Sequence, residues 1–88
     1  MTHIKEVVNM KTVQISLNSI DKVKSFVNDI TKFDYDFDLV SGRYVIDAKS
    51  IMGIFSLDLS KPIDLNIHAD NAADVDTILE VLTPYICE

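Results

Sequence analysis

Residues 33–39 alternate strictly between apolar and acidic side chains, in the order Phe-Asp-Tyr-Asp-Phe-Asp-Leu. Successive side chains of a strand point to opposite faces of a sheet, so this run predicts a strand with one buried and one solvated face. Ser41 and Gly42 follow as a tight turn, and residues 43–47 return as a second strand. The sequence therefore predicts a β-hairpin over residues 33–47, whose apolar face needs a second layer to cover it.

Two further strands and three helices are predicted around this hairpin. Residues 12–17 and 63–68 alternate in the same way. Apolar residues recur at helical spacing from Ile20 to Ile30, directly after Asn18 and Ser19, which are favoured N-cap residues.

The other two helices differ in length. A short, mostly apolar segment follows the N-cap residue Ser50 and extends to Leu57, and a last helix follows Asp70-Asn71 and ends before Pro84. The order β-α-β-β-α-β-α predicts an α+β fold, an open-faced sandwich with a four-stranded, mainly antiparallel sheet and three helices on one face.

One domain over residues 11–88 accounts for all of these elements, because a chain of 88 residues has no room for a second core. Residues 1–10 show no clear period and are expected to be an N-terminal appendage. Only one of Tyr44 and Val45 can face inward, since they are adjacent in one strand. We expect most of the core from Val13, Ile15, Leu17, Val23, Val27, Ile30, Tyr44, Ile46, Leu65, Ile67, Ile78, Leu79 and Leu82.

The composition excludes several classes of function. Fourteen Asp and Glu residues against eight Lys and Arg residues give a net charge of −6, which argues against a nucleic-acid partner. No apolar stretch approaches the roughly 20 residues of a membrane span, so no membrane partner is expected. The first ten residues lack the apolar region of a signal peptide, and a cytoplasmic location is therefore expected.

No metal or other cofactor is expected either. The sequence contains one cysteine, Cys87, and two histidines, His3 and His68, which do not make a structural zinc site. The aspartates at positions 34, 36 and 38 lie along one face of a strand, where they form a poor calcium cage.

The element order and three short motifs resemble the histidine-containing phosphocarrier (HPr) family of the bacterial sugar phosphotransferase system. The motifs are Lys32-Phe33-Asp34, the turn at residues 41–42, and Ala48-Lys49-Ser50-Ile51-Met52-Gly53 followed by Leu57. The likeness covers roughly residues 11–86. It implies the HPr fold and a role in the phosphotransferase system, as a phosphocarrier or regulatory protein and not as an enzyme.

The resemblance also implies where the chemistry of the family would lie. HPr proteins carry a phosphoryl-accepting histidine in a Gly-x-His-x-Arg-Pro stretch at the N-terminus of the first helix. Counting back from Lys32-Phe33, Ser19 falls on the histidine position and Asp21 on the arginine position. A serine hydroxyl without a base is a poor acceptor, and Asp21 would repel the phosphoryl group. His68 falls in the fourth strand, where a surface residue without chemistry is expected.

Two other features of the family fall on the short second helix. In part of the family, the serine at the position of Ser50 is phosphorylated by an ATP-dependent kinase; the alternative is that Ser50 only caps the helix. The family also uses this helix to bind enzyme I, enzyme IIA domains and the kinase. We expect Ile51, Met52 and Phe55 near the surface as the partner-binding residues, and Ile54 nearer the core.

Three hypotheses remain open at this point. The first is a regulatory or interaction module that has lost phosphotransfer and docks through the second helix, with HPr kinase-like regulators or phosphotransferase-system proteins as partners. The alternative is an active phosphocarrier that uses an unrecognised acceptor, such as Ser19 or His3. The third is an α/β ligand-binding domain unconnected with phosphotransfer.

Overall fold

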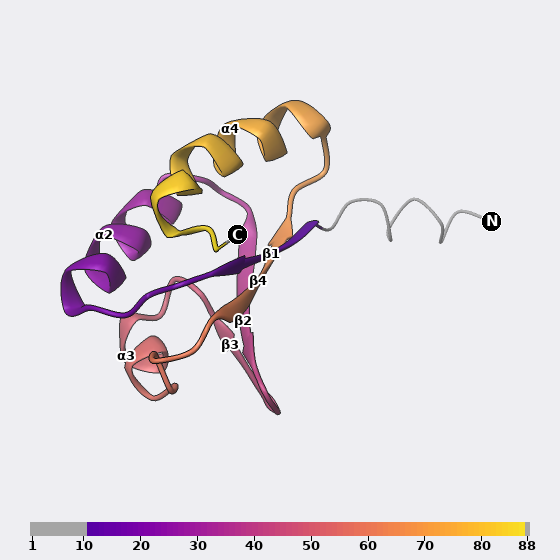
Figure 1. Ribbon diagram of the computed structural model, residues 1–88. Coiled ribbons are helices and arrows are strands. Elements are labelled where there is room, and N and C mark those ends of the chain that lie inside the picture. The colour runs from indigo at the N-terminus through magenta and orange to yellow at the C-terminus, as the bar shows by residue number, and fades with distance from the viewer. Residues whose placement is uncertain (1–10, 88) are drawn as a thin grey trace.

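A computed structural model describes residues 11–87 of the chain and shows one sheet whose helices lie on a single side (Figure 1). The predicted appendage at residues 1–10 and Glu88 lie outside the described residues. The strands are β1 (Lys11–Ile15), β2 (Asp36–Ser41), β3 (Tyr44–Asp47) and β4 (Ile63–His68). The helices are α2 (Ile20–Ile30), α3 (Ile51–Phe55) and α4 (Ala72–Leu82), with the 3₁₀ turn η1 (Thr83–Tyr85) after α4.

The sheet has the strand order β1-β4-β2-β3, and all three neighbouring pairs are antiparallel. The predicted α+β fold is therefore confirmed. No helix within residues 11–87 is long and apolar enough to cross a membrane.

The core lies between the sheet and the helices. Eight of the thirteen predicted core residues are fully buried, namely Ile15, Leu17, Val23, Ile30, Leu65, Ile67, Ile78 and Leu82. Val13, Val27, Ile46 and Leu79 are partly buried and pack against them. The core also contains large side chains outside that predicted set, namely Phe26, Phe37, Leu39, Ile63 and Tyr85, together with Ile54, which was predicted to lie nearer the core.

Tyr44 was predicted to lie in the core, but 69% of its surface is exposed, so this prediction is wrong. The residue begins β3 directly after the turn, and the tip of the hairpin extends away from the helices (Figure 1). The turn consists of Gly42 and Arg43, and Gly42 has a φ of +60°, the left-handed conformation that glycine adopts without strain. The apolar contact of the hairpin with the core comes instead from Phe37 and Leu39 of β2 and from Ile46 of β3, the pairing partner of Leu39.

Strand β2, the first strand of the hairpin, also begins three residues later than the alternation predicted. It begins at Asp36, and residues 33–35 form a bend. The Tyr35 hydroxyl hydrogen-bonds to Asp74 and, at 3.1 Å, to Asp70, so it ties the bend to the start of α4. These long-range contacts override the local strand pattern.

Tyr85 joins the C-terminal segment to α2 and β1. Its ring packs edge-on against Phe26 at 5.6 Å between centroids, and its hydroxyl lies 2.7 Å from Ser25 Oγ and donates to Asp29 Oδ2 at 2.8 Å. The carbonyl of Tyr85 accepts a hydrogen bond from the Ser16 amide at 2.8 Å. Burial raises the pKa of the Tyr85 phenol above its usual range, and the Asp29 carboxylate adds to this increase.

We predict that Tyr85→Phe lowers the free energy of unfolding by about 1 kcal/mol at neutral pH, since the variant keeps the ring but loses the hydroxyl contacts. The raised pKa adds a second expectation. Above about pH 10 the unfolded chain loses the phenolic proton before the folded chain does, so the contribution of Tyr85 to stability falls as the pH rises. The advantage of the wild type over the variant should therefore shrink above pH 10 in urea unfolding curves.

The matched control for this prediction is Tyr44→Phe, which removes the hydroxyl of an exposed tyrosine. It should leave the free energy of unfolding unchanged at neutral pH. An equal loss in both variants, or a difference between wild type and Tyr85→Phe that is constant with pH, would contradict the assignment.

Candidate functional site

An open groove of about 510 Å³ lies between the start of α2 and the end of α3. It brings together two of the predicted site residues, Ser19 and Phe55, which are far apart in the sequence. The residues that line it are Asn18, Ser19, Ile20, Phe55, Leu59 and Ser60. None of them is a histidine or carries a charge, so the groove offers shape and apolar contact rather than acid–base chemistry.

Ser19 is the N-cap of α2. Its backbone is extended, with φ −148° and ψ 156°, and its hydroxyl oxygen accepts a hydrogen bond from the Lys22 amide at 3.1 Å. This geometry satisfies one of the free amides at the start of the helix. Asp21 places a carboxylate in the first turn, where the helix dipole favours negative charge. Ser19 and Asp21 therefore stabilise the start of α2 without an imidazole or a bound anion.

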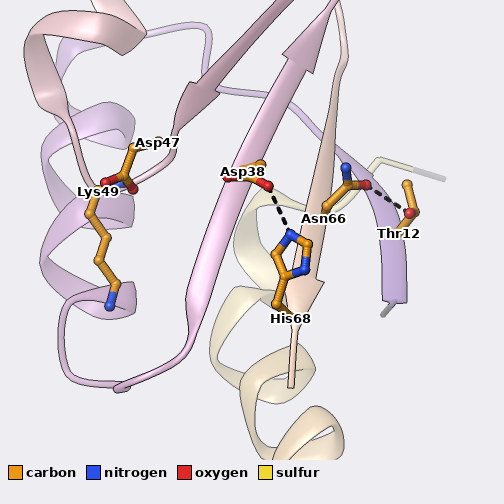
Figure 2. Close-up of polar contacts among 6 residues, drawn as sticks. All are labelled: Thr12, Asp38, Asp47, Lys49, Asn66 and His68. Carbon is orange, nitrogen blue, oxygen red and sulfur yellow. Dashed lines mark hydrogen bonds and ion pairs between the residues drawn. The ribbon is translucent and has the colours of Figure 1, made fainter. Parts of the chain in front are cut away.

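His68 lies on the face of the sheet that the helices do not cover. It ends β4, where Ile63, Leu65 and Ile67 point to the core and the intervening side chains point away from it. Figure 2 shows its ring directed at Asp38, with 2.8 Å between Nε2 and Asp38 Oδ2. Its side chain is exposed, as expected, and it lies across the sheet from the groove.

Among the described residues, Asp36 and Asp38 on this face do not belong to a cluster that could hold a metal ion. A hydrogen bond of 2.8 Å from Thr12 to Asn66 continues the row of polar side chains (Figure 2). Within residues 11–87 no group of three or more His, Cys, Asp or Glu side chains has an arrangement that could hold a metal ion. The other histidine, His3, lies outside the described residues.

Ser50 is the N-cap of α3, and its hydroxyl oxygen accepts from the Gly53 amide at 3.2 Å. A Cβ on Gly53 would lie 3.2 Å from Ser50 Oγ and 3.3 Å from Ile46 Cδ1. The glycine thus lets the serine side chain fold over the first turn of α3 while the helix packs on β3. Ser50 itself is exposed.

The exposure predicted for α3 is confirmed for Met52 and Phe55 but not for Ile51, which was also expected near the surface. Met52 is 77% exposed and Phe55 is 41% exposed, whereas Ile54 is fully buried. Ile51 is half-buried and packs against the core. A short helix on a sheet must alternate in this way, because only one of its sides can face the core.

The structure adds Ile20 to the predicted surface. It is 61% exposed although it begins the apolar pattern of α2, because the first residue of the helix lies beyond the edge of the core. Leu59, from the loop after α3, completes the apolar wall. Its position could not be predicted from periodicity, since it belongs to neither helix. We call Ile20, Met52, Phe55 and Leu59 together the docking face.

Two of the sequence motifs contact each other. Lys49 Nζ donates to the Phe33 carbonyl at 2.7 Å and lies 5.6 Å from the centroid of the Phe37 ring. The Lys49 amide donates to Asp47 Oδ1 at 2.9 Å, and both residues are drawn in Figure 2. Lys49 therefore holds the bend before β2 against the start of α3, which sets the position of Ser50 and of the docking face.

Comparison with known proteins places these features in a family. The family model described as "PTS HPr component phosphorylation site" matches residues 21–86. A crystal structure of HPr-C-His from Thermoanaerobacter tengcongensis is similar, with a TM-score of 0.65 and 26% identity over 82% of this chain and 89% of that chain. A phosphocarrier protein HPr from Bacillus anthracis str. Ames has a TM-score of 0.62 and 28% identity over 89% and 95% of the two chains. The family match begins at Asp21, two residues after Ser19.

We predict that Ser19→Ala lowers the free energy of unfolding by about 1 kcal/mol, because it removes the cap of α2. Ser19→Gly is the matched variant, since glycine is tolerated at an N-cap and should cost only a few tenths of a kcal/mol. Thermal or urea unfolding measures both values. Equal stability of wild type and Ser19→Ala would show that the hydroxyl does not cap the helix.

Proposed function

The chain belongs to the HPr family of phosphotransferase-system components, and we propose that within that system it is a regulatory docking module rather than a histidine phosphocarrier. Membership of the family removes the hypothesis of an unrelated ligand-binding domain. The proposal rests on the groove, where an apolar contact surface adjoins a helix start that lacks an acceptor imidazole.

The loss of phosphotransfer follows from the groups around Ser19. A phosphoryl acceptor needs a nucleophile that is free of its proton, and a serine hydroxyl reaches that state only with a base beside it. The residues that line the groove supply no base, and the Ser19 oxygen already accepts from the Lys22 amide. Asp21 adds repulsion to an incoming phosphoryl group. His68 lies on the other face of the sheet and does not replace the missing imidazole.

The docking face supplies the binding energy in this proposal. Exposed Met and Phe side chains beside a groove are adaptable apolar contacts, and such anchors dominate the energy of small interfaces. Ile51 is half-buried and packs against the core, so it adds less exposed surface than Met52 and Phe55. The partners proposed are those implied by the family, namely enzyme I, enzyme IIA domains and HPr kinase-like regulators.

Ser50 is the proposed site of regulation. Its hydroxyl is exposed and its only hydrogen bond among the described residues is the one from Gly53, so a kinase can reach it. A phosphate there would place a negative charge within the surface formed by Met52 and Phe55. Addition of a phosphate to Ser50 would therefore change the affinity of this surface for its partners. The alternative reading, in which Ser50 only caps α3, requires no modification.

We predict that phosphorylation falls on Ser50 and not on Ser19 or a histidine. Incubation with enzyme I, phosphoenolpyruvate and magnesium should give no gain in mass, because the groove has no acceptor. Incubation with a bacterial HPr kinase and ATP should add one acid-stable phosphate, detected by mass spectrometry.

Ser50→Ala should abolish the acid-stable phosphate, and Ser19→Ala should keep it. Two results would contradict this prediction. Labelling that persists in Ser50→Ala would place the site elsewhere. A phosphate from phosphoenolpyruvate that survives base but not acid would mark a phosphohistidine and an active phosphocarrier.

We predict that Met52→Ala or Phe55→Ala weakens binding to enzyme I or to the kinase by at least about tenfold, equivalent to roughly 1.4 kcal/mol. Ser19→Ala should weaken binding by less than about threefold. Isothermal titration calorimetry measures these affinities, and an unfolding curve for each variant separates lost binding from lost stability.

Val45→Ala is the matched control, because Val45 is also an exposed apolar residue but lies outside the docking face. It should leave the affinity unchanged. Normal binding by both helix variants together with a strong loss in Ser19→Ala would make the region around Ser19 the functional site.

A further inference from the structure

The two edges of the sheet differ in how they are covered. The outer edge of β1 is paired with the C-terminal segment, since the Ser16 amide donates to the Tyr85 carbonyl and the Cys87 amide donates to the Gln14 carbonyl at 2.9 Å. Strand β3 forms the opposite edge, and no segment of residues 11–87 pairs with its outer side. The edge strand β3 is therefore open along its outer side.

The hydrogen bonds of the hairpin fix which groups point outward. The Ala48 amide donates to the Phe37 carbonyl at 2.8 Å, and the ladder continues through the pairs Leu39–Ile46 and Ser41–Tyr44. In an antiparallel ladder the pairing alternates, so Tyr44 and Ile46 bond to β2 whereas Val45 and Asp47 point their backbone groups outward. The Asp47 carbonyl accepts from the Ser50 amide at 3.0 Å, and the free groups are then the amide and carbonyl of Val45 and the amide of Asp47.

This edge is short, with four residues, but it carries no lysine, proline or bulge, and no other described segment covers it. Natural edge strands are often blocked from pairing by such features. The sequence here is Arg43-Tyr44-Val45-Ile46-Asp47, with β-branched and aromatic residues in the centre. Tyr44 and Val45 are among the most exposed large apolar side chains of the described residues.

The same five residues are complementary to themselves in the antiparallel direction. When Val45 lies opposite the Val45 of another copy, its free amide and carbonyl meet the matching carbonyl and amide. In that register Tyr44 lies opposite Ile46, and Arg43 lies opposite Asp47, at both ends of the pair. Arg43 is exposed, and no carboxylate of residues 11–87 lies within ion-pair distance of it. The Lys49 amide uses only Oδ1 of Asp47 and leaves Oδ2 available.

We propose that β3 is a self-association edge, which pairs antiparallel with β3 of a second copy of this chain about a two-fold axis at Val45. Each half of the interface repeats the other, as two-fold symmetry requires. The pairing joins the two sheets edge to edge and satisfies the outward groups of both Val45 residues. It uses none of the residues that line the groove, so it is independent of the proposed function and leaves the docking face accessible.

The charge pair gives a sharp test by sedimentation velocity over a micromolar to millimolar range of the intact chain. The wild type should form dimers at high concentration. Arg43→Glu and Asp47→Lys should each raise the dimer dissociation constant at least about tenfold, because each variant sets two like charges opposite each other. An equimolar mixture of the two variants should dimerise again, because every carboxylate then lies opposite a cation.

Two further variants separate edge pairing from a general effect of charge or stability. Val45→Pro removes an amide that does not bond to β2, so it should abolish the dimer, with the far-ultraviolet circular dichroism unchanged. Lys24→Glu reverses a charge on the exposed side of α2 and should leave the dimer intact. A wild type that stays monomeric at millimolar concentration, or a variant mixture that does not recover the dimer, would overturn the proposal.

Discussion

Strand β4 lies between β1 and β2 in the sheet, and its side chains Ile63, Leu65 and Ile67 are buried in the core. Burial of each such side chain stabilises the fold by about 1.5–3 kcal/mol relative to exposure. A shift of β4 by one residue would turn Asp64 and Asn66 into the core, so the alternation fixes the register. The same alternation fixes His68 on the uncovered face, opposite Asp36 and beside Asp38.

This constraint separates the stability of the fold from the chemistry at its surface. The start of α2 needs an oxygen to cap its amides, and Ser19 supplies it through the bond from Lys22. The core beneath it, from Val23 to Ile30, makes no contact that depends on an imidazole. The start of α2 is therefore capped by a serine without an imidazole, while the groove beside it keeps its apolar wall. Fold and phosphotransfer are separable properties, and only the first is secured by packing.

The periodic segments predicted most of the fold, since each strand and helix needs only its own apolar pattern to be recognised. The errors have tertiary causes. The bend at residues 33–35 is held by Asp70 and Asp74, which are far from it in the sequence. Tyr44 is exposed because the helices do not reach the tip of the hairpin. For the site, the capping serines and the exposed side of α3 were predictable from local pattern. Ile20 and Leu59 were not, because the groove exists only once α2 and the loop after α3 meet.

Net charge sets the kind of contact that this chain can make with a protein. At −6, two copies or an acidic partner repel each other at long range, but salt at 0.1 M screens that repulsion beyond about 10 Å. Close association must then come from short-range interactions. In the two proposals these are apolar contact at the docking face, and backbone hydrogen bonds with an Arg43–Asp47 ion pair at the β3 edge. The uncovered sheet face carries Asp36, Asp38 and Asp64 and offers neither of these two kinds of interaction. Its carboxylates favour contact with water, and the two proposed binding surfaces lie elsewhere, at the groove and at the β3 edge.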